Sequence, residues 1–280
     1  MRHAGASAVT AKTARALLVY VFVAWCMVPL LWLISISVRP EVSAFKPNPF
    51  AAFAPTFSNY TGDFSTGGVL HGLEISAIAV GVTTALALIL GIPIAYVTTQ
   101  IWPSSSKASA RIMLYYLSAI ITPPIALLFP LYNAFDIVHL IGSVWCILIL
   151  YTFFSLPLAV LLMRTYFLSV PREMREAARV DGASEWRVLT TCMMPIVRGG
   201  LVATAVLCVL QQWNEYMFAS VLVSGTNATL PVVIASFLNF EGTQWGPLSA
   251  AGVVGAIPMV VFALLVQRQL ARGLTFGAVK

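Results

Sequence analysis

The chain has 280 residues and a formal net charge of +6, and 59% of its residues are hydrophobic while only 9% are charged. An ordinary soluble domain carries about 25% charged residues, so this composition excludes a soluble single-domain enzyme, and its apolar content excludes a disordered chain. With a mean hydropathy of +0.89, the sequence predicts an all-α protein that crosses a membrane several times.

Six apolar runs are long enough to cross a bilayer, which takes about 20 residues as a helix. The first run follows a basic lead, as in a signal peptide, but it exceeds the usual apolar length of about 7–15 residues, which predicts an uncleaved helix. Six spans place both termini on the same side of the membrane. The predicted spans are 16–38, 75–96, 112–135, 140–163, 199–223 and 248–267.

The basic residues are distributed unevenly between the two sides that these spans define. Of the 16 Lys and Arg residues, all but Arg39 and Lys46 fall on one side. Because cytoplasmic loops are enriched in Lys and Arg, this side is predicted to be cytoplasmic. The excess of positive charge is therefore interpreted as topological and not as a nucleic-acid site. The predicted organisation is a cytoplasmic N-terminal segment at 1–15, a six-helix transmembrane domain at 16–267 and a cytoplasmic tail at 268–280.

The longest basic loop, residues 171–195, carries signals for two short helices. Pro171 suits the first turn of a helix, and Gly182 is placed to end that helix in a left-handed cap. Ser184 can cap a second helix, which Pro195 is expected to end. The loop therefore predicts a helix, a glycine turn and a second helix on the cytoplasmic side.

The same loop resembles the EAA loop of the permease subunits of ABC importers. That pattern is EAA, three residues, glycine, nine residues and I-x-L-P, and the full spacing is present here, with Cys192 in place of Ile and Met194 in place of Leu. The residues that carry the pattern are Glu176, Ala177, Ala178, Gly182 and Pro195.

Further motifs resemble the carbohydrate branch of these permeases, the maltose and glycerol-phosphate type. They are the W-N-E-aromatic motif at 213–216, the P-L-aromatic element at 130–132 and the tail G-L-T-F-G-A-V-K at 273–280. Ile75 departs from the branch, which has asparagine at this position. The resemblance covers about residues 16–280 and implies the type I permease fold of ABC importers.

In the resembled family the EAA helix docks on a cytoplasmic ATPase. The resemblance assigns this role to Glu176, Ala177, Ala178, Asp181, Gly182 and Pro195. The residues themselves leave an alternative open, because an amphipathic helix could lie on anionic lipid through its arginines at positions 172, 175 and 179.

The C-terminal residues are too polar and rich in glycine to be expected to continue the sixth span. The resemblance implies that this tail reaches the interface between two ATPase subunits, through Gly273, Leu274, Gly277 and Lys280. The alternative is a frayed chain end.

Glu215 is the one charged residue inside the predicted spans, and a charge in a span marks a functional candidate. It lies 16 residues after Gly199, about 24 Å along a helix at 1.5 Å per residue, and so near the outer face. Three roles stay open: lining a sugar pathway, anchoring a neighbouring helix, or relaying a proton. The candidate pathway residues are Tyr132, Trp213, Asn214 and Glu215.

The sequence contains no phosphate-binding G-x-x-x-x-G-K-[ST] motif and no C-x-x-C pair among its four cysteines. We therefore expect no catalytic residue, no metal site and no cofactor, with ATP hydrolysed by another chain. The implied protein is a multi-pass permease subunit of a bacterial inner membrane, importing a sugar or sugar-like polyol. Its implied partners are a second permease subunit, a cytoplasmic ATPase dimer, an extracytoplasmic solute-binding protein and membrane lipid. The alternative is a proton-coupled secondary transporter that uses Glu215.

Overall fold

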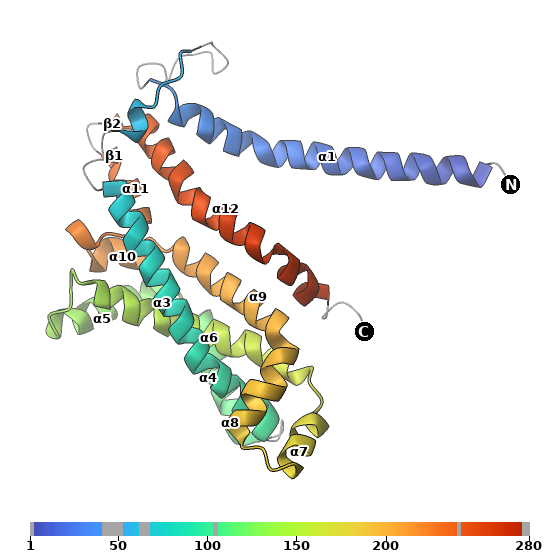
Figure 1. Cartoon of the computed structure of the whole chain (residues 1–280). Coiled ribbons are helices and arrows are strands. Elements are labelled where there is room, and N and C mark those ends of the chain that lie inside the picture. Colours follow the sequence, from blue (N-terminus) through green and yellow to red (C-terminus); the bar gives the residue numbers. More distant parts are fainter. Residues whose placement is uncertain (1–2, 41–52, 62–67, 103–105, 240–241, 276–280) are drawn as a thin grey trace. The chain divides into compact units, whose positions relative to one another are not determined.

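The computed structural model describes residues 3–40, 53–61, 68–102, 106–239 and 242–275 (Figure 1). These residues are almost entirely helical, which confirms the predicted all-α class. Within them the strands are β1 (Leu238–Asn239) and β2 (Gly242–Thr243), a short antiparallel pair. The chain divides into two compact units: residues 1–67 with 234–256, and residues 68–233 with 257–280.

Five helical segments of the described chain are long and apolar enough to span a membrane, and a bent pair of helices makes up to six. This agrees with the predicted number of spans. The five are α1 (His3–Ser37), α3 (Gly68–Tyr96) extended by the π-helix η3 (Val97–Ile101), α6 (Val144–Leu168), the segment Glu185–Trp213, and α12 (Trp245–Thr275).

The third predicted span, expected as one helix over 112–135, is broken. The helices α4 (Lys107–Ile121) and α5 (Pro124–Ile137) meet at an angle of 95°. Between them, Thr122 and Pro123 both have extended backbones, each with a ψ of 123°. A residue before proline is disfavoured in the helical region, and two consecutive prolines remove two backbone donors. The tandem prolines therefore explain the break.

The fifth predicted span, 199–223, also ends earlier than expected. Helix α9 (Met194–Trp213) stops at Trp213, and a separate short helix, α10 (Met217–Leu222), follows. The 3₁₀ turn η5 (Gly225–Asn227) and helix α11 (Leu230–Ser236) come next. Glu215 thus lies in the connection between two helices and not within a span.

The sixth candidate span ends at Gln267, the predicted end, but its helix continues beyond the span. Helix α12 continues through Gly273 and Leu274 to Thr275, where a non-helical tail was expected. Glycine costs about 1 kcal/mol relative to alanine inside a helix, which weakens a helix without stopping it. The two other predicted tail residues, Gly277 and Lys280, lie outside the described residues.

In the second unit, α3, α6 and α9 pack together around buried small residues (Figure 1). A Cβ at Gly91 of α3 would lie 3.1 Å from the Cβ of Ala159 on α6, so these helices approach closely. A polar chain crosses the same core: Thr83 donates to Gln212, which donates to Ser155. Small residues and interhelical hydrogen bonds are what hold membrane helices together.

In the first unit, residues of η2 (Ser58–Tyr60) form hydrogen bonds with the C-terminal end of α1. The Asn59 amide donates to the carbonyls of Ser37 and Arg39 at 2.9 and 2.8 Å, and the Tyr60 hydroxyl donates to Ser37 Oγ at 2.7 Å. The Arg39 guanidinium lies 4.3 Å from the centre of the Phe53 ring. Arg39, an exception to the predicted charge asymmetry, is thus buried against an aromatic ring.

Candidate functional site

The loop at 171–195 has the predicted helix, glycine turn and serine cap. Helix α7 (Arg172–Val180) is followed by the turn residue Gly182, whose φ is +82°. The amides of Gly182 and Ala183 donate to the carbonyls of Arg179 and Ala178, both at 3.0 Å, which is the Schellman pattern of a glycine C-cap. Ser184 Oγ then accepts from the backbone amide of Arg187 at 3.3 Å and caps the following helix.

The prediction that Pro195 ends the second helix is wrong. Helix α8 (Glu185–Arg187) runs through the π-helix η4 (Val188–Met193) into α9, and Pro195 stands in the first turn of α9. Proline is favoured in a first turn, where its missing N–H would have no partner. The loop therefore joins the fifth span as one continuous helical segment.

The arginines of α7 face the rest of the second unit. Arg172 Nη2 donates to the carbonyls of Thr99 and Trp102, at 2.6 and 2.8 Å, beyond the end of α3. Arg175 and Arg179 both reach the carboxylate of Glu185. One face of α7 is thus held by contacts within the chain.

Four side chains meet at Glu185, and we call Tyr96, Arg175, Arg179 and Glu185 the Glu185 cluster. Tyr96 donates its hydroxyl to Glu185 Oε2 at 2.7 Å, and Arg175 Nε donates to the same oxygen at 3.1 Å. Arg175 Nη2 pairs with Oε1, and Arg179 Nε lies 3.4 Å from Oε1. The Arg175 and Glu185 side chains are 18% and 34% exposed. Hydrogen bonding to Glu185 raises the pKa of Arg175 above its ordinary value.

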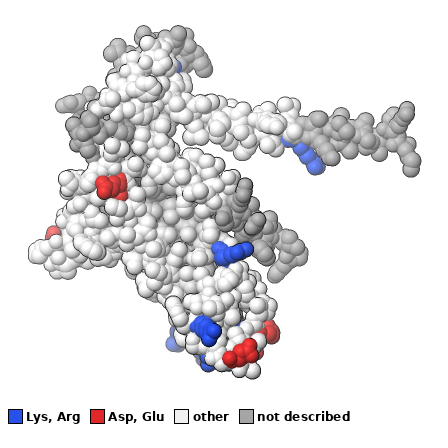
Figure 2. Space-filling view, viewed as in Figure 1, with Lys and Arg blue, Asp and Glu red and all other residues white. Residues whose placement is uncertain are grey.

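The opposite face of α7 is exposed. Its residues include Met174 at 46% and Val180 at 88% exposure, together with Ala177. In the view of Figure 2, charged side chains gather around α7 and α8 while much of the remaining described surface is uncharged.

Of the residues that the EAA resemblance singled out, these are exposed: Glu176, Ala177, Asp181, Gly182 and Pro195. Ala178 is half-buried against the core cluster of Val188 and Leu189.

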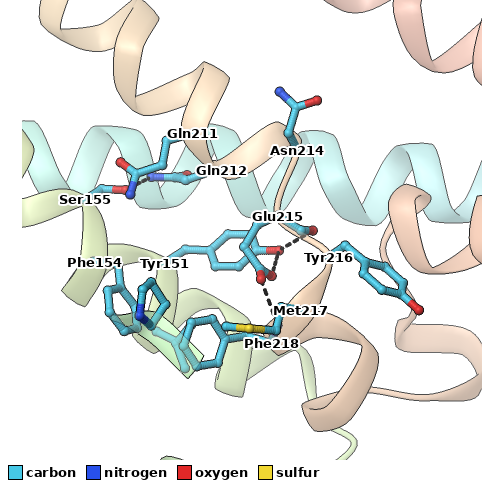
Figure 3. A pocket seen from close by; sticks show the side chains of 12 residues that line it. Tyr151, Phe154, Ser155, Gln211, Gln212, Asn214, Glu215, Tyr216, Met217 and Phe218 are labelled. Atoms are coloured by element: carbon cyan, nitrogen blue, oxygen red, sulfur yellow. Dashed lines mark hydrogen bonds between the residues drawn. The ribbon is translucent and has the colours of Figure 1, made fainter. Parts of the chain in front are cut away.

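A cavity of about 420 Å³ opens elsewhere in the second unit, where α6 faces the connection between α9 and α10 (Figure 3). Binding pockets for small molecules have about 300–1,000 Å³. No Lys, Arg or His is among the residues that line it. The lining residues are Pro124, Leu150, Tyr151, Phe154, Ser155, Gln211, Gln212, Asn214, Glu215, Tyr216, Met217 and Phe218.

Glu215 stands at the centre of this pocket with three donors around it (Figure 3). Its Oε1 accepts from the amide of Phe218 at 2.7 Å, and its Oε2 accepts from the amide of Ala219 at 3.1 Å and the Tyr151 hydroxyl at 3.0 Å. The carboxylate therefore caps the first turn of α10 and ties it to α6. These contacts are those of an anchor between helices.

The other candidate pathway residues are placed differently. Asn214 lines the pocket but donates its amide to the Leu210 carbonyl at 2.8 Å and points away from Glu215 in Figure 3. Trp213 and Tyr132 are not among the lining residues. Gln211 and Gln212 line it and were missed, although two adjacent amides in an apolar run are a signal that the sequence contains.

Comparison with known proteins gives consistent matches. Residues 87–276 match the family described as "Binding-protein-dependent transport system inner membrane component". The chain is 32% identical to "Probable ABC transporter permease protein y4oR" of Sinorhizobium fredii, over 97% of this chain and 98% of that one. It is 34% identical to "Trehalose transport system permease protein SugB" of Mycobacterium tuberculosis, over 92% and 94%. A solved structure, a bacterial ABC transporter involved in the import of the acidic polysaccharide alginate, matches 94% of this chain and 98% of its own at a TM-score of 0.77 and 20% identity.

Proposed function

Since the chain belongs to the family of binding-protein-dependent transport system inner membrane components, we propose that it forms half of the membrane path of an ATP-driven importer for a sugar or a sugar-like polyol. As a permease subunit it lies in the bacterial inner membrane and catalyses no covalent reaction. The observation that carries the ATP-driven part of the proposal is the two-faced helix α7. Arg172 and Arg175 are half-buried and the exposed Arg179 pairs with Glu185, while small, apolar and acidic residues are turned outward.

The outward face of α7 suits a protein partner better than a lipid surface. A helix that binds anionic lipid needs free cationic side chains. Here Arg172 donates to backbone carbonyls, and Arg175 and Arg179 pair with Glu185. What remains exposed is small and apolar at Ala177 and Val180, beside acidic groups. This surface fits a cleft with basic groups, and we assign the ATPase to it.

Five of the six predicted coupling residues have a role in this docking, and the sixth, Ala178, is half-buried against the core of the second unit. Ala177 permits close approach of the partner, and Glu176 and Asp181 present carboxylates to basic side chains or backbone amides. Gly182 supplies the turn that sets the end of α7. Pro195 begins α9, so a displacement of the loop acts on the fifth span directly. The loop then lies in the cytoplasm with both chain termini.

We place the sugar pathway along the pocket of Figure 3. Sugars bind through aromatic faces and hydrogen bonds to their hydroxyls, and this pocket combines Phe154 and Tyr216 with the amide of Gln211, while Glu215 anchors the wall of the pocket. Two comparisons point to the same substrate class, since one relative is named for trehalose transport and the similar solved structure is involved in alginate import. Asn214, Trp213 and Tyr132 flank this pathway in the proposal.

The remaining partners follow from the same assignment. A second permease subunit completes the membrane path, and a dimer of ATPases docks on the loops of the two permeases. The solute-binding protein meets the outer loops, including Thr229 to Gly246. The tail that begins at Gly273 and Leu274, and continues to Gly277 and Lys280, reaches the ATPase interface. Lipid covers the outer apolar surfaces.

A proton-coupled transporter working alone is less well supported. Its relay acid would be Glu215, yet that carboxylate accepts three hydrogen bonds and no basic residue lines its pocket.

The test is a gentle-detergent purification of the tagged chain from its host, with mass spectrometry of the proteins that follow it. We expect an ATPase, a second permease and a solute-binding protein to co-purify with the parent chain. Glu176→Lys is expected to lose the ATPase while keeping the second permease, and Asp136→Lys, which makes the same change of charge on an exposed residue outside the loop, serves as the control.

A transport assay completes the test. Vesicles that contain the purified assembly are supplied with labelled trehalose or maltose, the binding protein and internal ATP. Uptake that needs ATP supports the proposal. A chain that purifies alone and accumulates solute without ATP would overturn it in favour of the secondary transporter.

A further inference from the structure

The loop at 171–195 is joined covalently to two spans only. Through Val170 it follows α6, and through Pro195 it enters α9. It has no covalent link to α3, the second span, whose last residue is Tyr96. Any force that reaches α3 from α7 must pass through side-chain contacts.

The Glu185 cluster supplies such contacts. The Tyr96 hydroxyl at the end of α3 and the Arg175 guanidinium on α7 both donate to the same oxygen of Glu185, at 2.7 and 3.1 Å. Glu185 therefore joins Tyr96 and Arg175, which lie 79 positions apart in the sequence. Hydrogen bonds to ionised groups are about twice as strong as those between neutral groups, and the partial burial of Arg175 limits screening by water.

A second set of contacts holds the same region together without charge pairing. The Gln100 amide of η3 donates to the carbonyls of Phe167 and Val170, at 2.6 and 3.2 Å, where α6 ends. The ring of Tyr96 also meets that of Phe167 edge-on, with 5.8 Å between the ring centres. The ends of α3 and α6 thus form one rigid support. The Glu185 cluster fastens α7 to it, together with Arg172, which donates to the carbonyls of Thr99 and Trp102.

We propose that Tyr96, Arg175 and Glu185 are positioning residues that make α7 and the end of α3 move as one body. This rests on the proposed function, in which an ATPase displaces α7. The cluster then passes that displacement to the second span as well as to the fourth and fifth. Without it, α7 would remain able to bind the ATPase but would pull on α3 much less.

The first test measures the attachment itself and needs no ATPase. Trypsin cuts after arginine, so the rate of cleavage between residues 172 and 187 in the detergent-solubilised chain reports how firmly the loop is held. Tyr96→Phe and Glu185→Gln leave every arginine in place. We expect both to speed cleavage by about fivefold or more, while Asp136→Asn, which removes an exposed carboxylate outside the loop, leaves the rate unchanged.

The second test measures transmission in the assembled importer, with binding protein and trehalose or maltose present. We expect Tyr96→Phe and Glu185→Gln to retain the ATPase during purification and to lower the solute imported per ATP hydrolysed by about fivefold or more. The conservative variant Glu185→Asp, which keeps a carboxylate acceptor for Tyr96 and Arg175, is expected to retain part of that ratio. If the cluster had a purely structural role, the variants would yield fewer assembled complexes, and the solute imported per ATP hydrolysed by those complexes would be unchanged.

Two outcomes would overturn the proposal: cleavage rates equal to that of the parent chain, or faster cleavage with an unchanged ratio of transport to hydrolysis. Loss of the ATPase from the parent chain would instead contradict the proposed function, and the cleavage test would still decide whether Glu185 fastens α7 to α3.

Discussion

At Gly182 the backbone turns between α7 and α8 with a φ of +82°, a conformation that costs a residue with a Cβ about 1–2 kcal/mol. A Cβ built there meets no atom within 4 Å, so only the backbone and the partner surface limit this position. Among residues with a Cβ, asparagine and aspartate tolerate the left-handed conformation best, and their side chains have nearly the same shape as each other.

We predict that Gly182→Asp abolishes uptake while Gly182→Asn keeps most of it. The two side chains differ in charge, and Asp181 and Glu176 already make this surface acidic. A further carboxylate would be buried against the partner without a basic group placed to pair with it, and an unpaired buried charge is costly. The measurement is uptake of labelled sugar, with the amount of chain in the membrane as control. An equal loss of uptake in both variants would mean that uptake depends on the backbone conformation at position 182 and not on charge at the docking surface.

Glu215 allows a prediction about stability. Its two oxygens accept from the amides of Phe218 and Ala219 and from the Tyr151 hydroxyl, and glutamine offers one acceptor oxygen in place of two. We predict that Glu215→Gln lowers the free energy of unfolding by about 1–3 kcal/mol, the cost of leaving a buried donor unpaired. Thermal unfolding of the purified assembly measures this.

Tyr151→Phe is the matched control for that measurement, since it removes one donor and leaves the carboxylate with the two backbone amides. Tyr151→Phe should lower the free energy of unfolding by less than Glu215→Gln does. If instead Glu215→Gln leaves stability unchanged and raises the sugar concentration for half-maximal uptake, then the carboxylate contacts sugar and is not an anchor.

At the level of helices, two adjacent glycines on α9 differ in their surroundings. A Cβ at Gly200 would lie 2.2–2.5 Å from ring atoms of Tyr166 on α6, whereas a Cβ at Gly199 would meet nothing within 4 Å. We predict that Gly200→Ala separates α6 from α9 and sharply reduces the amount of folded protein. Gly199→Ala should be neutral or stabilising by about 0.5–1 kcal/mol, because alanine favours helix.

The comparison is made by membrane expression level and thermal unfolding of the two variants side by side. Their chemistry and position in the helix are nearly the same, so helix propensity cannot explain a difference between them. Equal behaviour would mean that Tyr166 moves aside and that the close contact between α6 and α9 is not required.

Features that depend on neighbours in sequence were predictable, and those that depend on distant partners were not. The glycine turn at Gly182 and the cap at Ser184 follow from local residue types, and the structure contains both. The tandem prolines at 123–124 were visible too, but the 95° bend that they produce was not foreseen. The contact between Tyr96 and Glu185 joins residues 89 positions apart, and no local pattern reports such a pairing.

At the scale of the whole molecule, α1 presents an apolar surface that needs a cover. Its large apolar side chains are exposed along the length of the span, with Tyr20 at 73% and Trp25 at 77%, and none of its apolar stretch is buried. Exposed apolar surface of this extent requires a lipid or protein cover. A second permease subunit and the bilayer are the covers that the proposed function provides.

The last prediction concerns the tail. Deleting residues 273–280 should leave the assembly intact but lower the ATP hydrolysis that is stimulated by binding protein and sugar by about fivefold or more, because a contact between permease and ATPase would be lost. Arg268 and Arg272 precede the deletion, so the charges that orient the sixth span are retained. The assay is sugar-stimulated ATPase activity per co-purified complex. Unchanged stimulation would mean that these residues lie away from the ATPases, and the loop at 171–195 would then be the main contact through which the two chains communicate.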